Sequence, residues 1–137
     1  MKALSIIPVI LFIYSCSNTV DCREVKYIDG VSYYKGKEYD GECESYFFNG
    51  NLKSKQFYTK GLDNKSWIFY YSNKNKKTEA FFKNGRRVGQ WNFYAKNGSI
   101  WKINFYDSLG APKGEWETYD TINGDLIELK KAKDIFN

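Results

Sequence analysis

The residue types that usually carry catalysis are scarce in this sequence. It contains no histidine, which excludes Ser/His/Asp and Cys/His nucleophilic sites, imidazole general bases and the commonest zinc ligand sets. Two short stretches place alternating carboxylates on one face of a strand, as the paired acids of a glycosidase require: Asp40, Glu42 and Glu44, and then Glu115 and Glu117. Alternating acids on a solvent face are far commoner, and nothing here supplies a pocket. We therefore expect no enzyme activity, no cofactor and no metal site.

Cysteines are the remaining candidates for covalent chemistry. Cys16 ends the segment Ile13-Tyr14-Ser15-Cys16, which resembles a bacterial lipobox, with a branched apolar residue three positions before the cysteine and a small residue next to it. The resemblance implies that Cys16 is acylated and becomes the new N-terminus. The alternative is an ordinary signal peptide that is cut nearby, with Cys16 incidental.

The segment before Cys16 has the anatomy of an export signal. One positive charge at Lys2 precedes an uncharged apolar run, residues 3–14, and this run is shorter than the roughly 20 residues of a membrane-spanning helix. Pro8 also disfavours such a helix. We expect residues 1–15 to be a lipoprotein signal peptide, and the mature protein to be exported to the bacterial cell envelope. Acyl chains on Cys16 would hold it at a membrane.

The other two cysteines, Cys22 and Cys43, fit an oxidising compartment, where a disulfide persists. Their bridge would join an N-terminal tether and first strand, residues 16–32, to the first repeat, and would contribute about 3 kcal/mol in the chain-entropy model. Two free thiols, with Cys43 filling a core position, are the alternative.

Most of the chain repeats with a period of 24 residues. One column of the repeat holds mainly tryptophan, a second holds tyrosine three residues later, and a third holds an aromatic pair. The columns are Cys43, Trp67, Trp91 and Trp116; Tyr46, Tyr70, Tyr94 and Tyr119; and Tyr33-Tyr34, Phe57-Tyr58, Phe81-Phe82 and Phe105-Tyr106. Such a period signals an array. We place the array at residues 33–124, followed by a last strand or tail at 125–137.

Each unit of the array is predicted to be a β-hairpin. Aromatic and β-branched residues suit its strands, and Asn-Gly suits a type I′ turn between them. Because side chains alternate across a strand, the tryptophan and tyrosine columns should lie on opposite faces of the sheet. We expect a core in which three phenylalanines fill the spaces between three tryptophans: Phe57, Phe81, Phe105, Trp67, Trp91 and Trp116. The predicted fold is all-β, an elongated twisted antiparallel sheet of repeated hairpins.

The pattern Gly-x-Trp-x-x-Tyr, four residues, Gly, an aromatic pair and another glycine resembles the MORN-variant repeat of bacterial proteins grouped as the YwqK-type antitoxin family. This resemblance covers residues 33–124 and implies an extended sheet that serves as an interaction surface. The sequence departs from the pattern at Cys43 in a tryptophan slot and at Lys65 and Lys74 in glycine slots. Beside Lys65, Asn64 is expected to shift the turn by one residue and accept a left-handed conformation.

Two functions remain. The first is a membrane-anchored scaffold that binds an envelope protein or polymer, and the second is an antitoxin or immunity protein that neutralises a specific toxin. The export signal favours the scaffold. Its candidate binding face is the tyrosine column, which is otherwise a half-buried face with solvated hydroxyls: Tyr46, Tyr70, Tyr94 and Tyr119. A formal net charge of +5 is too small and too scattered to predict nucleic-acid binding, although it permits attraction to an anionic membrane or polymer.

Overall fold

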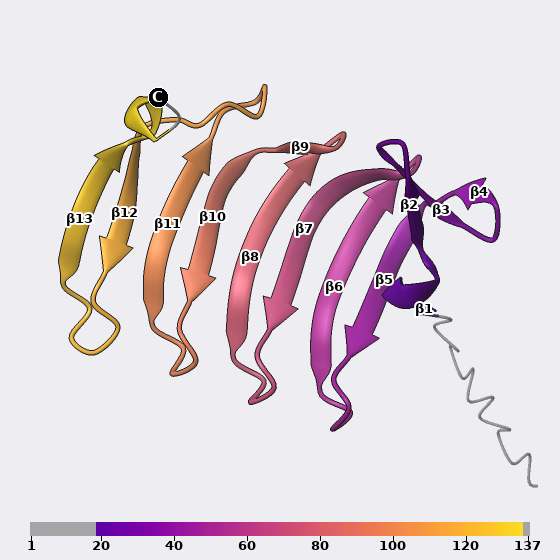
Figure 1. The fold of residues 1–137 in the computed structure, drawn as a ribbon, viewed down its shortest axis with the longest axis horizontal. Helices are drawn as coiled ribbons and strands as arrows, with labels where there is room; N and C mark the ends of the chain where they lie inside the picture. The colour runs from indigo at the N-terminus through magenta and orange to yellow at the C-terminus, as the bar shows by residue number, and fades with distance from the viewer. Residues whose placement is uncertain (1–18, 136–137) are drawn as a thin grey trace, which may run out of the picture.

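The repeats fold as β-hairpins that join edge to edge in one open sheet (Figure 1). The structure is a computed structural model and describes residues 19–135; the predicted signal segment and Cys16 lie outside them. The prediction of an all-β antiparallel fold is confirmed. The hairpins are β5 (Gly41–Tyr46) with β6 (Leu52–Thr59), β7 (Leu62–Tyr70) with β8 (Lys76–Lys83), β10 (Gly89–Tyr94) with β11 (Ile100–Tyr106), and β12 (Glu115–Tyr119) with β13 (Leu126–Lys131).

Short elements complete the fold at both ends of the array. At its N-terminal end β1 (Val20–Asp21) pairs with β5 in parallel and leads into a 3-10 turn, η1 (Cys22–Glu24). A separate sheet follows, made of β2 (Lys26–Ile28), β3 (Val31–Tyr34) and β4 (Lys37–Glu38), so the aromatic pair Tyr33-Tyr34 lies outside the main sheet. β9 (Arg86–Arg87) turns back and pairs antiparallel with the end of β8, and η2 (Ala132–Asp134) follows β13.

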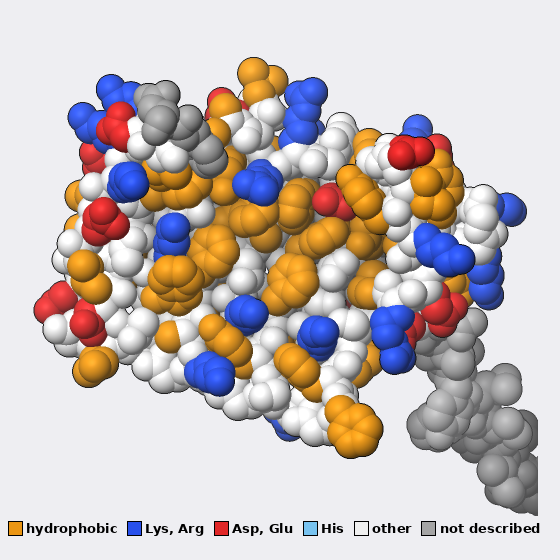
Figure 2. Space-filling view, in the orientation of Figure 1, with side chains coloured by type: hydrophobic (Ala, Val, Ile, Leu, Met, Phe, Trp, Pro, Cys, Tyr) orange, Lys and Arg blue, Asp and Glu red, His pale blue; other side chains and the backbone are white. Residues whose placement is uncertain are grey.

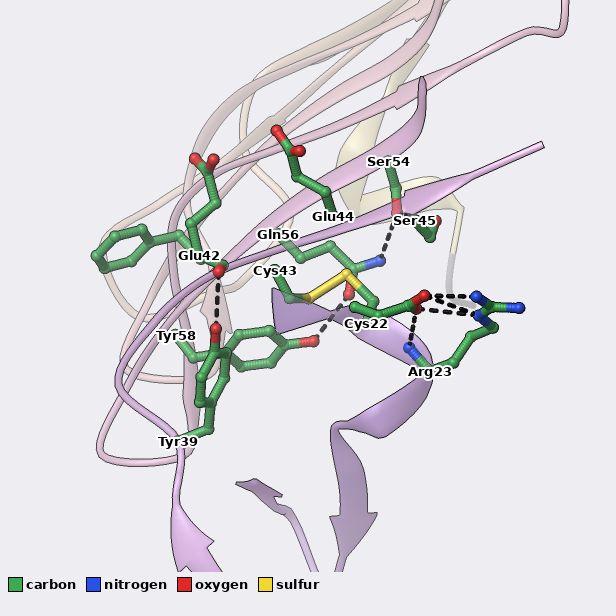
Figure 3. The surroundings of a disulfide bond; sticks show 12 residues. Cys22, Arg23, Tyr39, Glu42, Cys43, Glu44, Ser45, Ser54, Gln56 and Tyr58 are labelled. Carbon is green, nitrogen blue, oxygen red and sulfur yellow. Dashed lines mark hydrogen bonds and ion pairs between the residues drawn. A yellow bond between two sulfur atoms is a disulfide. The ribbon is translucent and has the colours of Figure 1, made fainter. Parts of the chain in front are cut away.

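A disulfide joins Cys22 to Cys43 and so ties η1 to β5 (Figure 3). Cys43 is fully buried and occupies the position that tryptophan holds in later repeats. Tyr39 and Tyr58 form the buried cluster with it, and Figure 3 shows both rings beside the bridge. The disulfide thus replaces an indole ring at the first position of the array.

The core is a row of rings that crosses the strands, which we call the aromatic ladder. Neighbouring rings lie 4.8 to 5.7 Å apart between centroids and are inclined by 49° to 62°, the tilted and edge-to-face geometries that aromatic pairs prefer. In order along the sheet the ladder contains Tyr34, Tyr39, Tyr58, Trp67, Phe82, Trp91, Tyr106 and Trp116. The ladder therefore runs from the small N-terminal sheet to β12 without a break.

The three predicted tryptophans are in the ladder, but the predicted fillers Phe57, Phe81 and Phe105 are not. The rings between the tryptophans belong to the second residue of each aromatic pair: Phe82 between Trp67 and Trp91, and Tyr106 between Trp91 and Trp116. Because side chains alternate, the first residue of each pair points to the other face. The prediction of Phe57, Phe81 and Phe105 as fillers is therefore wrong by one residue in each pair.

The displaced phenylalanines still hold the ladder through their backbone. Each tryptophan indole N–H donates to the carbonyl oxygen of the phenylalanine one pair earlier, at 2.9 Å for Trp67, 3.0 Å for Trp91 and 3.2 Å for Trp116. The acceptors are Phe57, Phe81 and Phe105. These bonds satisfy the indole donors, which is the condition for burying tryptophan at low cost.

The turns differ from the predicted type I′ geometry. At Asn49-Gly50 only the glycine has a positive φ, of 80°, and its amide donates to the Phe47 carbonyl oxygen, which describes a type I turn followed by a left-handed glycine. The asparagine side chain accepts a hydrogen bond from the amide two residues later, a bond that recurs in all four hairpins. Pairs of positive φ occur instead between hairpins, as at Lys60-Gly61.

Two lysines hold left-handed positions that glycine holds in the other repeats. Lys65 has a φ of 53° and Lys74 a φ of 73°. The expectation that Asn64 would relieve Lys65 is wrong, because Lys65 itself takes the positive φ. Both residues carry the strain that a Cβ atom causes in this region.

Candidate functional site

The main sheet is a single layer with two different faces. Figure 2 shows the face that carries the ladder, where a band of hydrophobic side chains crosses the strands and Lys and Arg side chains lie apart from one another below it. The opposite face carries the tyrosine column, and we call it the tyrosine face. Within residues 19–135 no second layer covers either face.

A β-bulge in every hairpin shapes the half of the ladder face nearest the Asn-containing turns. In each hairpin the register shifts by one residue near the end of the first strand, which leaves one residue of the return strand without a direct partner. A bulge of this kind re-aims side chains. The extra residues are Lys53, Lys77, Trp101 and Ile127.

These bulges help to build a second group of rings, which we call the lysine–aromatic strip: Phe47, Lys53, Phe69, Tyr71, Lys77, Phe93, Trp101 and Lys102. Lysine ammonium groups lie over its rings, with Nζ-to-centroid distances of 6.0 Å for Lys53 over Phe47 and 5.8 Å for Lys77 over Tyr71. Lys102 Nζ lies 6.0 Å from the Trp101 ring centroid and 5.5 Å from that of Trp116, a ladder ring, so the strip and the ladder meet at this residue. These are cation–π distances, so each hairpin from β5 to β11 presents a positive charge above an aromatic surface.

The strip is open and its charges have no internal partners. A hollow of about 230 Å³ lies between Phe47, Lys53, Phe69, Tyr71 and Lys77 and has no carboxylate in its lining. Trp101 is 38% exposed. The ion pairs of Lys55 and Lys76 lie outside the strip. In the described part of the chain none of the three strip lysines is in an ion pair; Lys53 and Lys77 are exposed and Lys102 is half-buried.

The tyrosine face carries the predicted tyrosine column, with hydroxyls that bond carboxylates. Tyr46 donates to Glu44, Tyr94 donates to Glu79 at 3.3 Å, and Tyr119 donates to Glu117. Tyr46 is exposed, while Tyr70, Tyr94 and Tyr119 are half-buried. The column therefore lies on one face, as predicted, but its polar groups are largely occupied by one another.

Ion pairs further saturate the tyrosine face. Lys55 Nζ lies 3.2 Å from Glu42 and 2.8 Å from Glu44, and Lys76 lies 3.0 Å from Glu79. The hydrogen bonds from Lys55 and Tyr46 lower the pKa of Glu44, and the bond to Glu44 raises the pKa of Tyr46. This surface holds its charges in internal pairs, in contrast to the strip.

Of the alternating carboxylates, Asp40, Glu42 and Glu44 each have a partner within the fold. Glu42 and Glu44 share Lys55, and Asp40 accepts a backbone hydrogen bond from Lys60 at 2.9 Å. A general acid needs a raised pKa, whereas the pKa of Glu44 is lowered. In the described part of the chain no three metal-ligating side chains of the His, Cys, Asp and Glu types converge. Nor does any helix there have the length and apolar character needed to span a membrane.

Sequence reasoning missed the strip, although part of its signal is in the repeat. Lys53 and Lys77 are 24 residues apart, as are Phe47 and Tyr71, and Phe69 and Phe93. With strict alternation, the side chains of Lys53 and Ser54 would lie on opposite faces of the sheet. The bulge places both of them on the ladder face. The 24-residue spacing of Lys53 and Lys77 is visible in the sequence, with Trp101 at the same position of the next repeat, but the face of the sheet to which these side chains point is not.

Two comparisons of the sequence with known proteins found no match. No family model matches the chain, and no curated protein matches it. The resemblance to MORN-variant repeats remains a prediction that rests on the 24-residue pattern.

Proposed function

We propose that this protein is a membrane-anchored scaffold whose lysine–aromatic strip binds an anionic polymer of the bacterial cell envelope. The observation that carries the proposal is the open row of unpaired lysines over aromatic rings. A ligand that brings negative charge satisfies those ammonium groups, and the rings supply apolar contact beside them.

The spacing of the lysines suits a chain-like ligand. Lys53, Lys77 and Lys102 lie on β6, β8 and β11, each two strands from the next in the sheet. Strands lie about 4.8 Å apart, so the lysines recur about every 9.6 Å. A polymer with regularly spaced anionic groups can meet all three at once, and linked contacts bind more tightly than single ones.

The tyrosine face is the weaker candidate for this role. Its carboxylates and ammonium groups already neutralise one another, and its tyrosine hydroxyls donate to those carboxylates. A ligand there would have to break these bonds before it could form its own. We therefore move the proposed binding face from the tyrosine column to the strip.

Binding is tested with the full chain in detergent micelles, using dextran sulfate as the anionic probe and neutral dextran as the blank. Reversal of the three strip charges, in Lys53→Glu, Lys77→Glu and Lys102→Glu combined, should weaken dextran sulfate binding at least tenfold in calorimetry. Binding should also fall as salt is added, because exposed charges are screened.

The matched control reverses three exposed lysines outside the strip: Lys26→Glu, Lys37→Glu and Lys83→Glu combined. Net charge changes equally, so general attraction falls equally, and the control should retain most of the affinity. Equal losses in both triple variants would contradict the strip as the site. Polyglutamate serves as a second probe. If the protein binds polyglutamate but not dextran sulfate, the proposed ligand becomes an acidic protein segment instead of an envelope polymer.

The anchor part of the proposal rests on the lipobox resemblance at Cys16. Labelling of growing cells with a fatty acid should mark the wild-type protein and not Cys16→Ala. Equal labelling of the two proteins would contradict the lipid anchor at Cys16 but would not affect the proposal that the strip binds a polymer.

A further inference from the structure

The last strand of the array has an open edge. β13 is the terminal strand of the main sheet, and all six of its residues are exposed. Three are apolar, with exposed fractions of 49% for Leu126, 64% for Ile127 and 51% for Leu129. Exposed edges of this kind are templates for pairing with another strand.

Backbone groups of β13 point outward at defined positions. The Ala132 amide donates to the Gly114 carbonyl oxygen at 3.0 Å, and the register then pairs Lys131 with Glu115 and Leu129 with Glu117. In an antiparallel ladder hydrogen-bonded pairs alternate with pairs whose polar groups point away. The amides and carbonyls of Leu129 and Lys131 therefore face away from β12, toward the open edge.

We propose that β13 pairs antiparallel with β13 of a second copy of this chain and so forms a two-fold dimer. With Leu129 on the axis, its outward amide and carbonyl meet those of Leu129 in the other copy. The same register places Glu128 beside Lys130 of the other copy, and Lys130 beside its Glu128. These are the close, non-hydrogen-bonded pairs of the new ladder, where side chains interact most strongly. The strand is complementary to itself in charge as well as in backbone.

The other end of the sheet favours a closed dimer rather than a filament. β1 is two residues long, and the chain then turns into η1, which the disulfide holds against β5. One long edge per chain gives an isologous contact that closes after two copies. Neighbouring residues across paired strands share a face, so the two ladder faces lie on the same side of the joined sheet. The inference is independent of what the strip binds.

The test measures the mass of the full chain in detergent micelles by light scattering across a range of concentrations. Wild type should reach the mass of two chains. Glu128→Lys and Lys130→Glu each place two like-charge contacts in the interface and should raise the dissociation constant at least tenfold. The combined variant, with both substitutions, restores both ion pairs in reversed order and should dimerise as wild type does.

Circular dichroism establishes that every variant retains its strands, and a second probe avoids charge altogether. Leu129→Pro removes the outward amide while no hydrogen bond to β12 is lost, so this variant should stay folded and become monomeric. A wild type of single-chain mass at every concentration overturns the proposal. So do single variants that dimerise normally, or a combined variant that remains monomeric.

Discussion

The aromatic ladder and the lysine–aromatic strip lie on one face of one sheet and use the same ring types in different ways. In the ladder, rings contact rings along the whole array, and Tyr106 and Trp116 are only 6% and 7% exposed. In the strip, lysines lie over the rings, and Trp101 is 38% exposed. The two groups differ in burial rather than in the presence of a cation, since Lys102 also lies 5.5 Å from the Trp116 ring and Arg87 5.5 Å from the Trp91 ring.

The largest expected difference between the two groups is in stability. Trp116→Ala removes a buried ring from the ladder and should lower the free energy of unfolding by about 4 kcal/mol. Trp101→Ala removes an exposed ring from the strip and should cost less than about 1 kcal/mol while weakening dextran sulfate binding. Urea unfolding of both variants makes the comparison. Similar losses in the two would mean that ladder and strip are one core.

The next effect concerns the end of the ladder that the disulfide closes. Replacing both bridge residues, in Cys22→Ala with Cys43→Ala, should cost about 3 kcal/mol, since the bridge closes a 21-residue separation. Polymer binding should persist, because the strip does not touch the bridge. Thermal melting with and without a thiol reductant checks this: the reductant should lower the melting temperature of wild type alone. A wild type unaffected by the reductant would contradict the role of the bridge.

A smaller effect, of opposite sign, lies in the turn beside the strip. Lys74 holds a φ of 73°, so Lys74→Gly should relieve strain and raise the free energy of unfolding by about 0.5 to 1 kcal/mol. Lys96→Gly, in the equivalent hairpin turn but without a positive φ, is the matched control and should destabilise by a similar amount. If both substitutions destabilise, the left-handed position carries no strain. Lys65→Gly should gain less, because Lys65 also lies 3.8 Å from the Phe57 ring centroid.

Alkaline pH should act on the ladder through Tyr58. Burial, and then the charge of Asp63, raises the pKa of this phenol above the value of about 10 in an unfolded chain. The neutral form is therefore favoured in the fold, so its stabilisation is fully present below about pH 10 and is lost as pH rises toward the folded pKa. Tyr58→Phe should flatten the decline in urea midpoint above about pH 10. If the urea midpoint of Tyr58→Phe falls with pH as steeply as that of wild type, a group other than Tyr58 causes the decline.

The repeat period made the fold predictable, because one column of tryptophans every 24 residues leaves few ways to stack hairpins. Which ring fills the space between tryptophans was not predictable to the residue, since Phe81 and Phe82 are both aromatic and only the register decides between them. The strip was even harder to predict from the sequence. The bulges at Lys53, Lys77 and Trp101 arise where the return strand follows a turn with a left-handed residue, which is Gly50, Lys74 or Gly98. Alternation alone assigns the three bulge residues to the wrong face.

The four tryptophans of the chain allow one direct test of the division between ladder and strip. The indole N–H groups of Trp67, Trp91 and Trp116 donate to backbone carbonyls inside the ladder, whereas Trp101 belongs to the strip. In a two-dimensional ¹⁵N–¹H NMR titration with dextran sulfate, the Trp101 indole signal should shift while those of Trp67 and Trp91 stay in place; Trp116 lies under Lys102 of the strip and is left out of the comparison. A shift of the Trp67 or Trp91 indole signal, or a Trp101 signal that does not respond to bound polymer, would contradict the account.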